Sequence, residues 1–375
     1  EACAATARSA VKSGDMVWVH NYALMLVPAA LKRVGLPANV LVSFFMHTPW
    51  PSPEVWRVLP HRAELLRSML SAEVVGFHLF EYARHFITSC RRQLGLEEHA
   101  GVGQGGGVLS VNVGARRVTV TVSHVGIDRD VICHRLKLDE TASAAERLRA
   151  RCVIGDRIVI GGVEMLNPLQ GAQIKLQAYE MLLRNYPIWR TKLTLIQVCF
   201  ADIAHPEVSE RTSAENRKIS ARIRADFGDD AIHYFEVGRE LPQVEWTMNV
   251  RLSLWRITDV LLNCAMKDGL SLLPFEYVLT KNEQHANGVV VLSEFVGCSH
   301  VLNGGVRINP FNLEQVVEQL DAALSMPPNE RAARLAKDYK FVSERAITVL
   351  QDNGMVATGA FAAGFAYGFY GYGAS

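Results

Sequence analysis

From Asp156 onward the sequence alternates short apolar runs with amphipathic segments, and this alternation limits the possible folds more than any other feature. Apolar runs separated by helical patterns are typical of βαβ units, which build a parallel sheet through right-handed crossovers. We therefore predict one complete Rossmann-like α/β domain here. We expect its strands at 157–163, 193–198, 232–235, 260–263, 289–292 and 306–308, and its helices at 173–183, 214–227, 244–257, 272–279 and 313–324.

The sequence before Asp156 follows a similar but incomplete pattern, which predicts a second Rossmann-like domain without its opening strands. Its elements are expected as strands at 16–20, 40–46 and 74–78, a hairpin-like pair at 108–113 and 118–124, and a linker leading into a helix at 129–150. The predicted organisation is a partial N-terminal domain at 1–150, a complete domain at 151–330, a C-terminal helix at 331–352 and a tail at 353–375. Ligands of such folds bind at the carboxyl ends of the strands and between domains.

The two ends of the sequence are unusual. The chain starts at Glu1 without Met and reaches a strand-like run almost at once, so we expect it to begin inside a longer protein; no signal-peptide pattern is present. The tail at 353–375 is uncharged and long enough to span a bilayer, but its six glycines and three tyrosines make a poor spanning helix. We predict a disordered Gly/aromatic tail, with a membrane or partner anchor as the alternative.

Composition excludes several classes of function. The chain has 39 Lys and Arg against 38 Asp and Glu. It therefore carries no excess of positive charge that would attract nucleic acid or an anionic membrane. The seven cysteines are scattered without a C-x-x-C pair, which indicates reduced thiols in the cytoplasm and neither a disulfide framework nor a zinc site. We expect no metal and no cofactor.

Two motifs have simpler interpretations than the ones they suggest. The glycines at 101–106 satisfy G-x-G-x-x-G, but polar residues precede them and a strand pair follows, so we predict a flexible loop and no dinucleotide site. His78 and His85 lie seven residues apart without a third ligand at metal spacing, and we interpret them as a pair that packs a helix.

Two strand ends carry polar residues suited to a ligand. Asp268 and Gly269 follow a buried strand and are expected to open a helix, where backbone N–H groups could seat an anion and Asp268 could bind sugar hydroxyls. Glu276 could hold a ribose diol; the alternative is a helix-capping Asp268 with a surface Glu276. His47 ends another strand before a Pro-rich turn, and it fits a cleft residue as well as a structural turn.

Five segments in order resemble trehalose-6-phosphate synthases. They read VWVHNYALMLVP, FFMHTPWPS, GFHLFEYARHFITSC, KDGLSLLPFEYV and VVVLSEFVGCS, and the resemblance runs from about Asp15 to about Val349. It implies the glycosyltransferase B fold, two Rossmann-like domains around a nucleotide-sugar cleft. It also implies retaining transfer of glucose from UDP-glucose to glucose 6-phosphate without a metal.

The resemblance assigns roles to five residues. His47 matches the family histidine near the transferred glucose, and Asp268 matches the aspartate that holds the glucose hydroxyls. Glu276 matches the glutamate on the uridine ribose, while Gly269 and Leu270 lie where family backbone amides face the donor.

The sequence departs from the family where charge matters most. The family donor motif V-D-R-L-D-Y-I-K-G is VEMLNPLQG here, so Met165 and Gln170 replace the two cations that grip the diphosphate. Losing both charge-assisted contacts costs about 3–6 kcal/mol, and Lys175 lies one helical turn beyond Gln170. Asn21 replaces the aspartate that contacts the acceptor, and 201–205 carry no arginine.

We therefore predict a trehalose-6-phosphate synthase-like domain whose donor site is eroded and weak or inactive. The segment at 293–299 resembles divergent eukaryotic members, which are often fused to a phosphatase domain and act as regulatory subunits. The alternatives are a working synthase and a non-catalytic regulatory or scaffolding subunit of a synthase complex.

Overall fold

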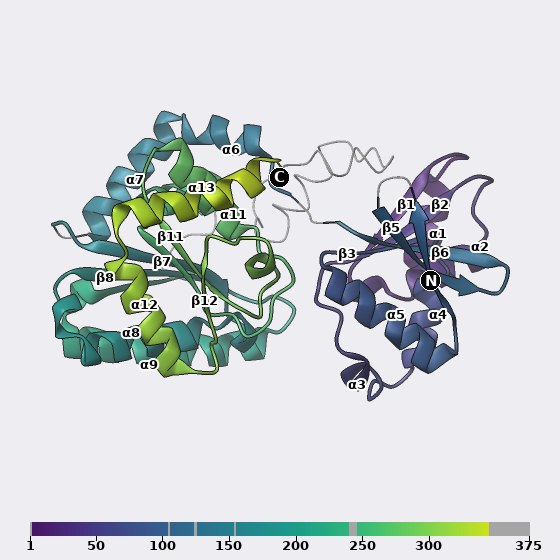
Figure 1. Cartoon of the computed structure of the whole chain (residues 1–375), viewed down its shortest axis with the longest axis horizontal. Coiled ribbons are helices and arrows are strands. Elements are labelled where there is room, and N and C mark those ends of the chain that lie inside the picture. The colour runs from purple at the N-terminus through teal and green to yellow at the C-terminus, as the bar shows by residue number, and fades with distance from the viewer. Residues whose placement is uncertain (1, 104–105, 124–125, 154, 240–245, 345–375) are drawn as a thin grey trace. The chain divides into compact units, whose positions relative to one another are not determined.

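A computed structural model of the chain describes residues 2–103, 106–123, 126–153, 155–239 and 246–344 (Figure 1). The chain divides into two compact units, residues 1–124 and residues 125–375. This division falls ahead of the boundary expected at residue 150, because the segment at 129–150 folds into two helices that pack Ile132, Leu136 and Ala145 into the core of the second unit. The tail predicted at 353–375 lies outside the described residues.

The first unit is built on a six-stranded sheet in the order β1-β2-β3-β6-β5-β4. Strands β1, β2, β3 and β6 run parallel, while β5 pairs antiparallel with both β6 and β4. The predicted parallel strands and the hairpin-like pair are confirmed. The elements are α1 (Ala2–Ala10), β1 (Met16–His20), α2 (Val27–Val34), β2 (Leu41–Met46), α3 (Pro53–Trp56), α4 (Arg62–Met69), β3 (Val74–Phe77), α5 (Phe80–Leu94), β4 (Glu98–Gly103), β5 (Gly106–Val113) and β6 (Arg116–Val122).

The glycine-rich segment at 101–106 belongs to this sheet. Gly101 to Gly103 end β4 and pair with Val108, Gly107 and Gly106 of β5, so the prediction of a flexible loop is wrong for these glycines. Antiparallel pairing satisfies their backbone groups, which sequence spacing could not indicate. A strand follows the motif where a dinucleotide site would require a helix.

The second unit contains a six-stranded, wholly parallel sheet in the order β12-β11-β10-β7-β8-β9. All six predicted strands are present within two residues at either end. The predicted helices are present, although α9 begins eight residues before the expected start at 214. The C-terminal helix predicted at 331–352 begins at Pro328, and its part from residue 345 onward lies outside the described residues. The elements are α6 (Arg129–Leu136), α7 (Asp139–Cys152), β7 (Ile158–Met165), α8 (Ala172–Asn185), β8 (Leu193–Phe200), α9 (Pro206–Phe227), β9 (Ile232–Val237), α10 (Met248–Ile257), β10 (Val260–Asn263), α11 (Leu273–Glu283), β11 (Val289–Ser293), β12 (Val306–Ile308), α12 (Leu313–Ser325) and α13 (Pro328–Glu344).

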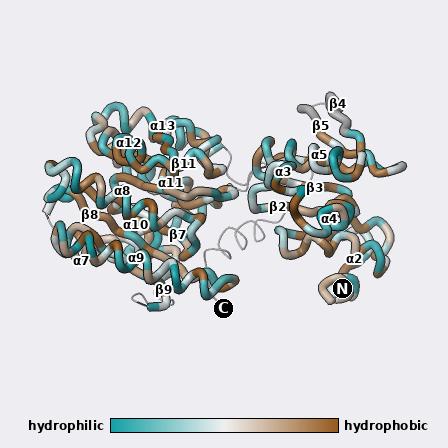
Figure 2. The backbone as a smooth tube through the Cα atoms, turned by 90° about the horizontal axis from the view of Figure 1, so that it is seen from below, coloured by the Kyte–Doolittle hydropathy of each residue, from teal (hydrophilic) through white to brown (hydrophobic). Residues whose placement is uncertain are grey.

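Helices cover both faces of this second sheet (Figure 1). α8, α9 and α12 pack one hydrophobic core against the sheet, while α6, α7, α10, α11 and α13 pack another on the opposite face. Burial on both faces explains why strands such as β8 are mostly apolar and are buried along nearly their whole length (Figure 2). Among the described residues, no helix is both long and apolar enough to cross a membrane.

Candidate functional site

Three histidines lie at one edge of the first sheet, where three neighbouring parallel strands end. His20 is the last residue of β1, and His47 and His78 directly follow β2 and β3. His20 Nδ1 lies 3.0 Å from His47 Nε2, and His47 Nδ1 lies 3.3 Å from His78 Nε2. The structure thus joins His47, a predicted site residue, to two histidines that the sequence did not connect with it.

Aromatic side chains contact these rings, and burial disfavours the charged form of His20 and His47. Trp18 lies 5.1 Å from His20, and Phe45 lies 4.8 Å from His47 and 5.0 Å from His78, measured between ring centroids. Burial lowers the pKa of His20 to about 4. Burial and, to a smaller extent, the neighbouring His20 lower the pKa of His47 to about 4. Both imidazoles are therefore neutral near pH 7.

Asn21 follows the first of these histidines in a strained backbone conformation. Its φ of 65° and ψ of 170° lie in a region that glycine normally occupies, at a cost of about 1–3 kcal/mol. Its N–H donates to Phe45 O at 2.8 Å, and Thr48 Oγ1 donates to Asn21 Oδ1 at 3.3 Å. Asn21, which was predicted to replace an acceptor-binding aspartate, therefore lies at the same edge as His47.

The expected pairing of His78 and His85 on one helix is wrong. His78 precedes α5 and contacts His47, whereas His85 lies within the helix with its Nε2 3.9 Å from Glu81 Oε1. The loop residue Leu79 separates His78 from the helix, so the seven-residue spacing does not place the two side chains on a common face.

The second unit offers a site at the centre of its sheet. β7 and β10 are neighbours, and the chain leaves them toward opposite faces, because α8 and α11 belong to different cores. Ligands of open α/β sheets bind outside the strand ends at such a switch point. The turn at 166–171 follows β7, the loop at 264–272 follows β10, and Met266 N–H donates to Leu169 O at 2.8 Å to join the two segments.

Two glycines let these segments approach closely. A Cβ on Gly171 would lie 1.9 Å from Cys264 O, and one on Gly297 would lie 1.8 Å from Gly269 O. Gly171 also has a φ of +72°, which favours glycine. The turn after β7, the loop after β10 and the segment after β11 therefore pack backbone against backbone around Asp268.

Asp268 lies at the middle of this arrangement. Its Oδ1 accepts a hydrogen bond from Gly269 N–H at 2.8 Å, and its Oδ2 is buried. Burial raises the pKa of Asp268 to about 6, although hydrogen bonds from Gly269 and the Gln170 side chain act in the opposite direction. The structure thus brings Asp268 and Gln170, two predicted site positions, into contact.

The loop after β10 differs from the expectation in one respect. α11 begins at Leu273 with no side-chain cap, so Asp268 neither opens nor caps that helix. Asp268 instead forms an isolated bridge with Val296, and this extended pairing delays the helix. The N–H of Gly269 is directed to its neighbour's carboxylate, while Leu270 is half-buried.

Glu276 is not the surface residue of the alternative interpretation. It is 2% exposed, and its Oε2 and Oε1 accept hydrogen bonds from Arg251 Nε and Nη2 at 2.8 and 2.9 Å. Trp255 Nε1 donates to the same carboxylate at 3.3 Å. Arg251 on α10 was not predicted from the sequence, because only the packing of α10 on α11 brings it to Glu276.

The positions expected to hold a diphosphate carry no cation. Met165 ends β7, and Gln170 ends the 3₁₀ turn Pro168–Gln170. Lys175 does not compensate, because it is 0% exposed and pairs with Glu164 in the core. Of the residues at 163–171 and 263–272, only the exposed Lys267 is positively charged.

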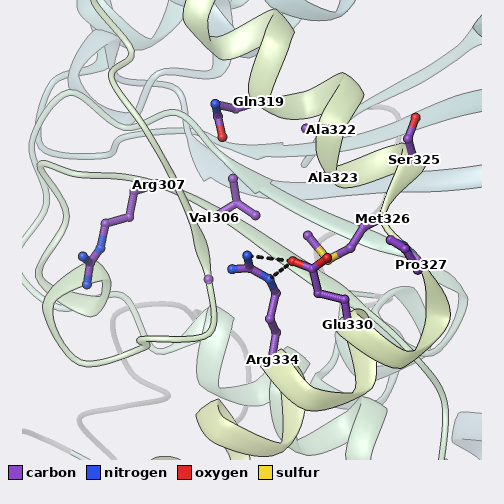
Figure 3. Close-up of a pocket in the computed structure, with 11 residues that line it drawn as sticks. Val306, Arg307, Gln319, Ala322, Ala323, Ser325, Met326, Pro327, Glu330 and Arg334 are labelled. Atoms are coloured by element: carbon purple, nitrogen blue, oxygen red, sulfur yellow. Dashed lines mark hydrogen bonds and ion pairs between the residues drawn. The ribbon is translucent and has the colours of Figure 1, made fainter.

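A hollow of about 480 Å³ lies elsewhere on this unit, between β12, α12 and the start of α13 (Figure 3). Its two pairing charges, Glu330 and Arg334, are 2.8 Å apart and neutralise each other. None of the predicted site residues lines it. In the part of the chain that the structure describes, no cluster of His, Cys, Asp and Glu could hold a metal ion.

Comparison with known proteins decides the family. The sequence profile of glycosyltransferase family 20 matches residues 1–353. The chain belongs to glycosyltransferase family 20. It is 34% identical over 341 residues to an alpha,alpha-trehalose-phosphate synthase (UDP-forming) of Pichia angusta, covering 89% of this chain and 68% of that protein. It is 36% identical over 337 residues to synthase A of Dictyostelium discoideum, covering 89% of this chain and 43% of that protein.

Solved structures of family 20 proteins agree with the fold. The N-terminal domain of the Candida albicans trehalose-6-phosphate phosphatase superposes with a TM-score of 0.81 at 28% identity, over 93% of this chain and 72% of that one. A Burkholderia xenovorans alpha,alpha-trehalose-phosphate synthase superposes with a TM-score of 0.80 at 28% identity, over 94% of this chain and 75% of that one. The predicted pair of Rossmann-like domains of the glycosyltransferase B fold is thus confirmed.

One further polar cluster lies beyond the strand ends of the second unit, and the sequence did not reveal it. Asp202 follows β8 and is 6% exposed; it accepts hydrogen bonds from Asn167 Nδ2 and His205 Nδ1, both at 3.2 Å. Burial raises the pKa of Asp202, but these bonds and one from Ala204 N–H outweigh it, so the pKa is lowered. A polar residue two positions after each of two neighbouring strands was the available signal.

Proposed function

We propose that this chain is a trehalose-6-phosphate synthase-like domain of trehalose biosynthesis, with a donor site that lacks the cations expected to bind the diphosphate. Glucosyl transfer from UDP-glucose to glucose 6-phosphate is then weak or absent. One observation carries the proposal. Met165 and Gln170 stand where the diphosphate would need cations, and the nearby Lys175 is locked to Glu164 in the core. The charge that builds on a departing nucleotide would then have no guanidinium or ammonium partner from these positions.

The magnitude of this loss favours a poor enzyme. Two charge-assisted hydrogen bonds contribute about 3–6 kcal/mol together. Their absence corresponds to a factor of about 10²–10⁴ in rate or affinity. Lys267 is exposed and its ammonium is free to stay hydrated, so an interaction from it would be worth at most about 1 kcal/mol.

The remaining residues would supply the sugar contacts. In this proposal His47 meets the transferred glucose, and Asp268 accepts or donates hydrogen bonds to its hydroxyls according to its protonation state. Glu276 would reach a ribose only by exchanging bonds with Arg251, which gives a second reason for weak donor binding. We also propose a cytoplasmic location, since all seven cysteines are free and five are buried.

Calorimetry with UDP and UDP-glucose tests this proposal. Wild-type protein should bind UDP weakly, and the double variant Met165→Arg/Gln170→Lys should bind it about 10²–10⁴ times more tightly. The control Asn185→Lys/Thr191→Lys adds the same charge at exposed positions on the opposite sheet edge, and it should leave UDP binding unchanged. Micromolar binding and turnover by the wild type, with no gain in the double variant, would contradict an eroded site.

The second candidate is a non-catalytic regulatory or scaffolding subunit of a trehalose-phosphate synthase complex. The similarity to the N-terminal domain of a trehalose-6-phosphate phosphatase supports it, since that solved domain has the same fold within a protein named for another activity. Here UDP would not bind at millimolar concentration even to the Met165→Arg/Gln170→Lys variant. Analytical ultracentrifugation of a mixture with a family 20 synthase would then show a complex. If the two proteins sedimented separately in that mixture, the idea would be rejected.

A further inference from the structure

The three histidines at the strand ends of the first unit form a continuous hydrogen-bonded chain. His47 is its middle member, because its Nε2 contacts His20 Nδ1 at 3.0 Å and its Nδ1 contacts His78 Nε2 at 3.3 Å. The planes of His20 and His47 differ by 27°, and those of His47 and His78 by 55°. Both nitrogens of His47 are therefore engaged by other imidazoles.

The chemistry of imidazole links the three rings. A neutral imidazole has one N–H donor and one acceptor nitrogen, so a neutral His47 must donate to one neighbour and accept from the other. When His20 donates to His47, His47 donates to His78; when His78 donates, the whole direction reverses. The tautomer of His47 is thus set by its two neighbours and not by solvent.

The surroundings favour this neutral arrangement. The strand-end residues at 20–22, 46–48 and 77–79 include no Lys, Arg, Asp or Glu, so no charged side chain from these segments competes for the imidazoles. His78 is 3% exposed, and a bond broken at that end would leave a buried polar group to be satisfied again. The rings of Trp18 and Phe45 limit the rotation of the imidazoles.

We propose that His20 and His78 are positioning residues, which hold His47 with both nitrogens bonded so that it meets a sugar with its C–H edge and not with an N–H donor. The sugar in this statement rests on the proposed function, whereas the arrangement of the three rings does not. His47 then contributes shape and a fixed ring orientation at this edge of the sheet. Neither nitrogen of His47 can take a proton directly from a sugar hydroxyl without breaking a bond to a neighbouring imidazole, so this arrangement disfavours His47 as a general base toward the sugar.

NMR of the ligand-free full chain tests the ring arrangement. With ¹⁵N-labelled histidine, His47 should show one protonated and one unprotonated nitrogen with little averaging, in contrast to His61, whose side chain is 79% exposed and provides the reference. Averaged nitrogen shifts for His47 like those of His61 would overturn the proposal before any variant is made.

Variants then assign the effect to the neighbours. His20→Phe and His78→Phe should each move the His47 nitrogens toward averaged values, while the control His61→Phe should leave them unchanged. His78→Gln restores one amide partner and should recover most of the single-tautomer signal. Unchanged His47 shifts in folded His20→Phe and His78→Phe proteins, with folding checked by thermal unfolding, would refute the positioning role.

Addition of UDP-glucose, which carries the transferred glucose that His47 is proposed to meet, separates this proposal from the proposed function. Shifts of the His47 ring C–H protons with unchanged nitrogen shifts are the expected result. A change in the nitrogen protonation pattern would overturn the positioning role and leave sugar binding intact. No change in any His47 resonance at millimolar UDP-glucose would instead contradict sugar binding at this edge, while the ring arrangement would stand on the ligand-free spectra.

Discussion

Asp268 links the stability of the protein to the chemistry of the site. Burial raises the pKa of Asp268 to about 6, compared with about 4 for an exposed aspartate. A shift of about two units corresponds to about 3 kcal/mol. An acid whose folded-state pKa is raised stabilises the fold below its unfolded pKa, and this contribution disappears as pH rises from about 4 through about 6. Above about pH 7, ionised Asp268 should therefore cost the fold about 3 kcal/mol.

Asp268→Asn removes this titration and keeps the oxygen that accepts from Gly269. Relative to wild type, the free energy of unfolding of the variant should rise by up to about 3 kcal/mol between about pH 4 and pH 7. Urea denaturation across that range measures the difference. Asp338→Asn is the matched control, because Asp338 is 2% exposed on α13 and burial also raises its pKa to about 6. It should show the same pH dependence without any change in UDP-glucose binding.

A pH-independent difference between wild type and Asp268→Asn would refute the reasoning. It would mean that Asp268 ionises in the folded protein as easily as in the unfolded chain, and that its carboxyl is hydrated. A pH-dependent gain accompanied by unchanged UDP-glucose affinity would place the destabilising carboxyl outside the donor site.

Two further predictions concern packing. Lys175→Met should lower the free energy of unfolding by about 3–5 kcal/mol, because it leaves Glu164 buried without its cation. The double variant Glu164→Gln/Lys175→Met should recover most of this free energy. Urea denaturation measures both changes. Arg184→Met, at an ion pair whose arginine is 53% exposed, should cost at most about 1 kcal/mol. An equal cost for Lys175→Met and Arg184→Met would show that burial of the Lys175 ion pair does not matter. Gly297→Ala should cost about 1–3 kcal/mol, because its Cβ would meet Gly269 O, whereas Gly305→Ala, with its nearest atoms at 3.5 Å, should be nearly neutral by thermal unfolding.

The sheets were the part of the fold most open to prediction. The inner strands of the second unit are buried on both faces, and β10 shows this directly, since Val260, Leu261, Leu262 and Asn263 are all buried. A run of that kind is visible in the sequence without any knowledge of its neighbours. The same reasoning located Asp268, because parallel strands end at one edge and polar residues in the loops that follow them lie where ligands bind.

Contacts between elements could not be predicted in this way. The bonds from Arg251 to Glu276 join α10 to α11, and no spacing rule relates residues 25 positions apart on different helices. The burial of Lys175 depends on the side of α8 that faces β7, where its ammonium meets Glu164. The histidine chain had a signal that passed unused, since three successive strand-like runs each end at a histidine and parallel strands bring these ends together.

The two strained features of the strand ends argue against a chain that only packs. The raised pKa of Asp268 predicts a cost of about 3 kcal/mol for its ionised form near neutral pH, and Asn21 occupies a glycine-like conformation at a cost of about 1–3 kcal/mol. A fold is stable by only about 5–15 kcal/mol, so these costs are a large share of it. Neither residue fills a core, and both lie where parallel strands end, the place at which α/β sheets bind ligands. These two costs therefore support the proposal that the strand ends are shaped to bind a sugar.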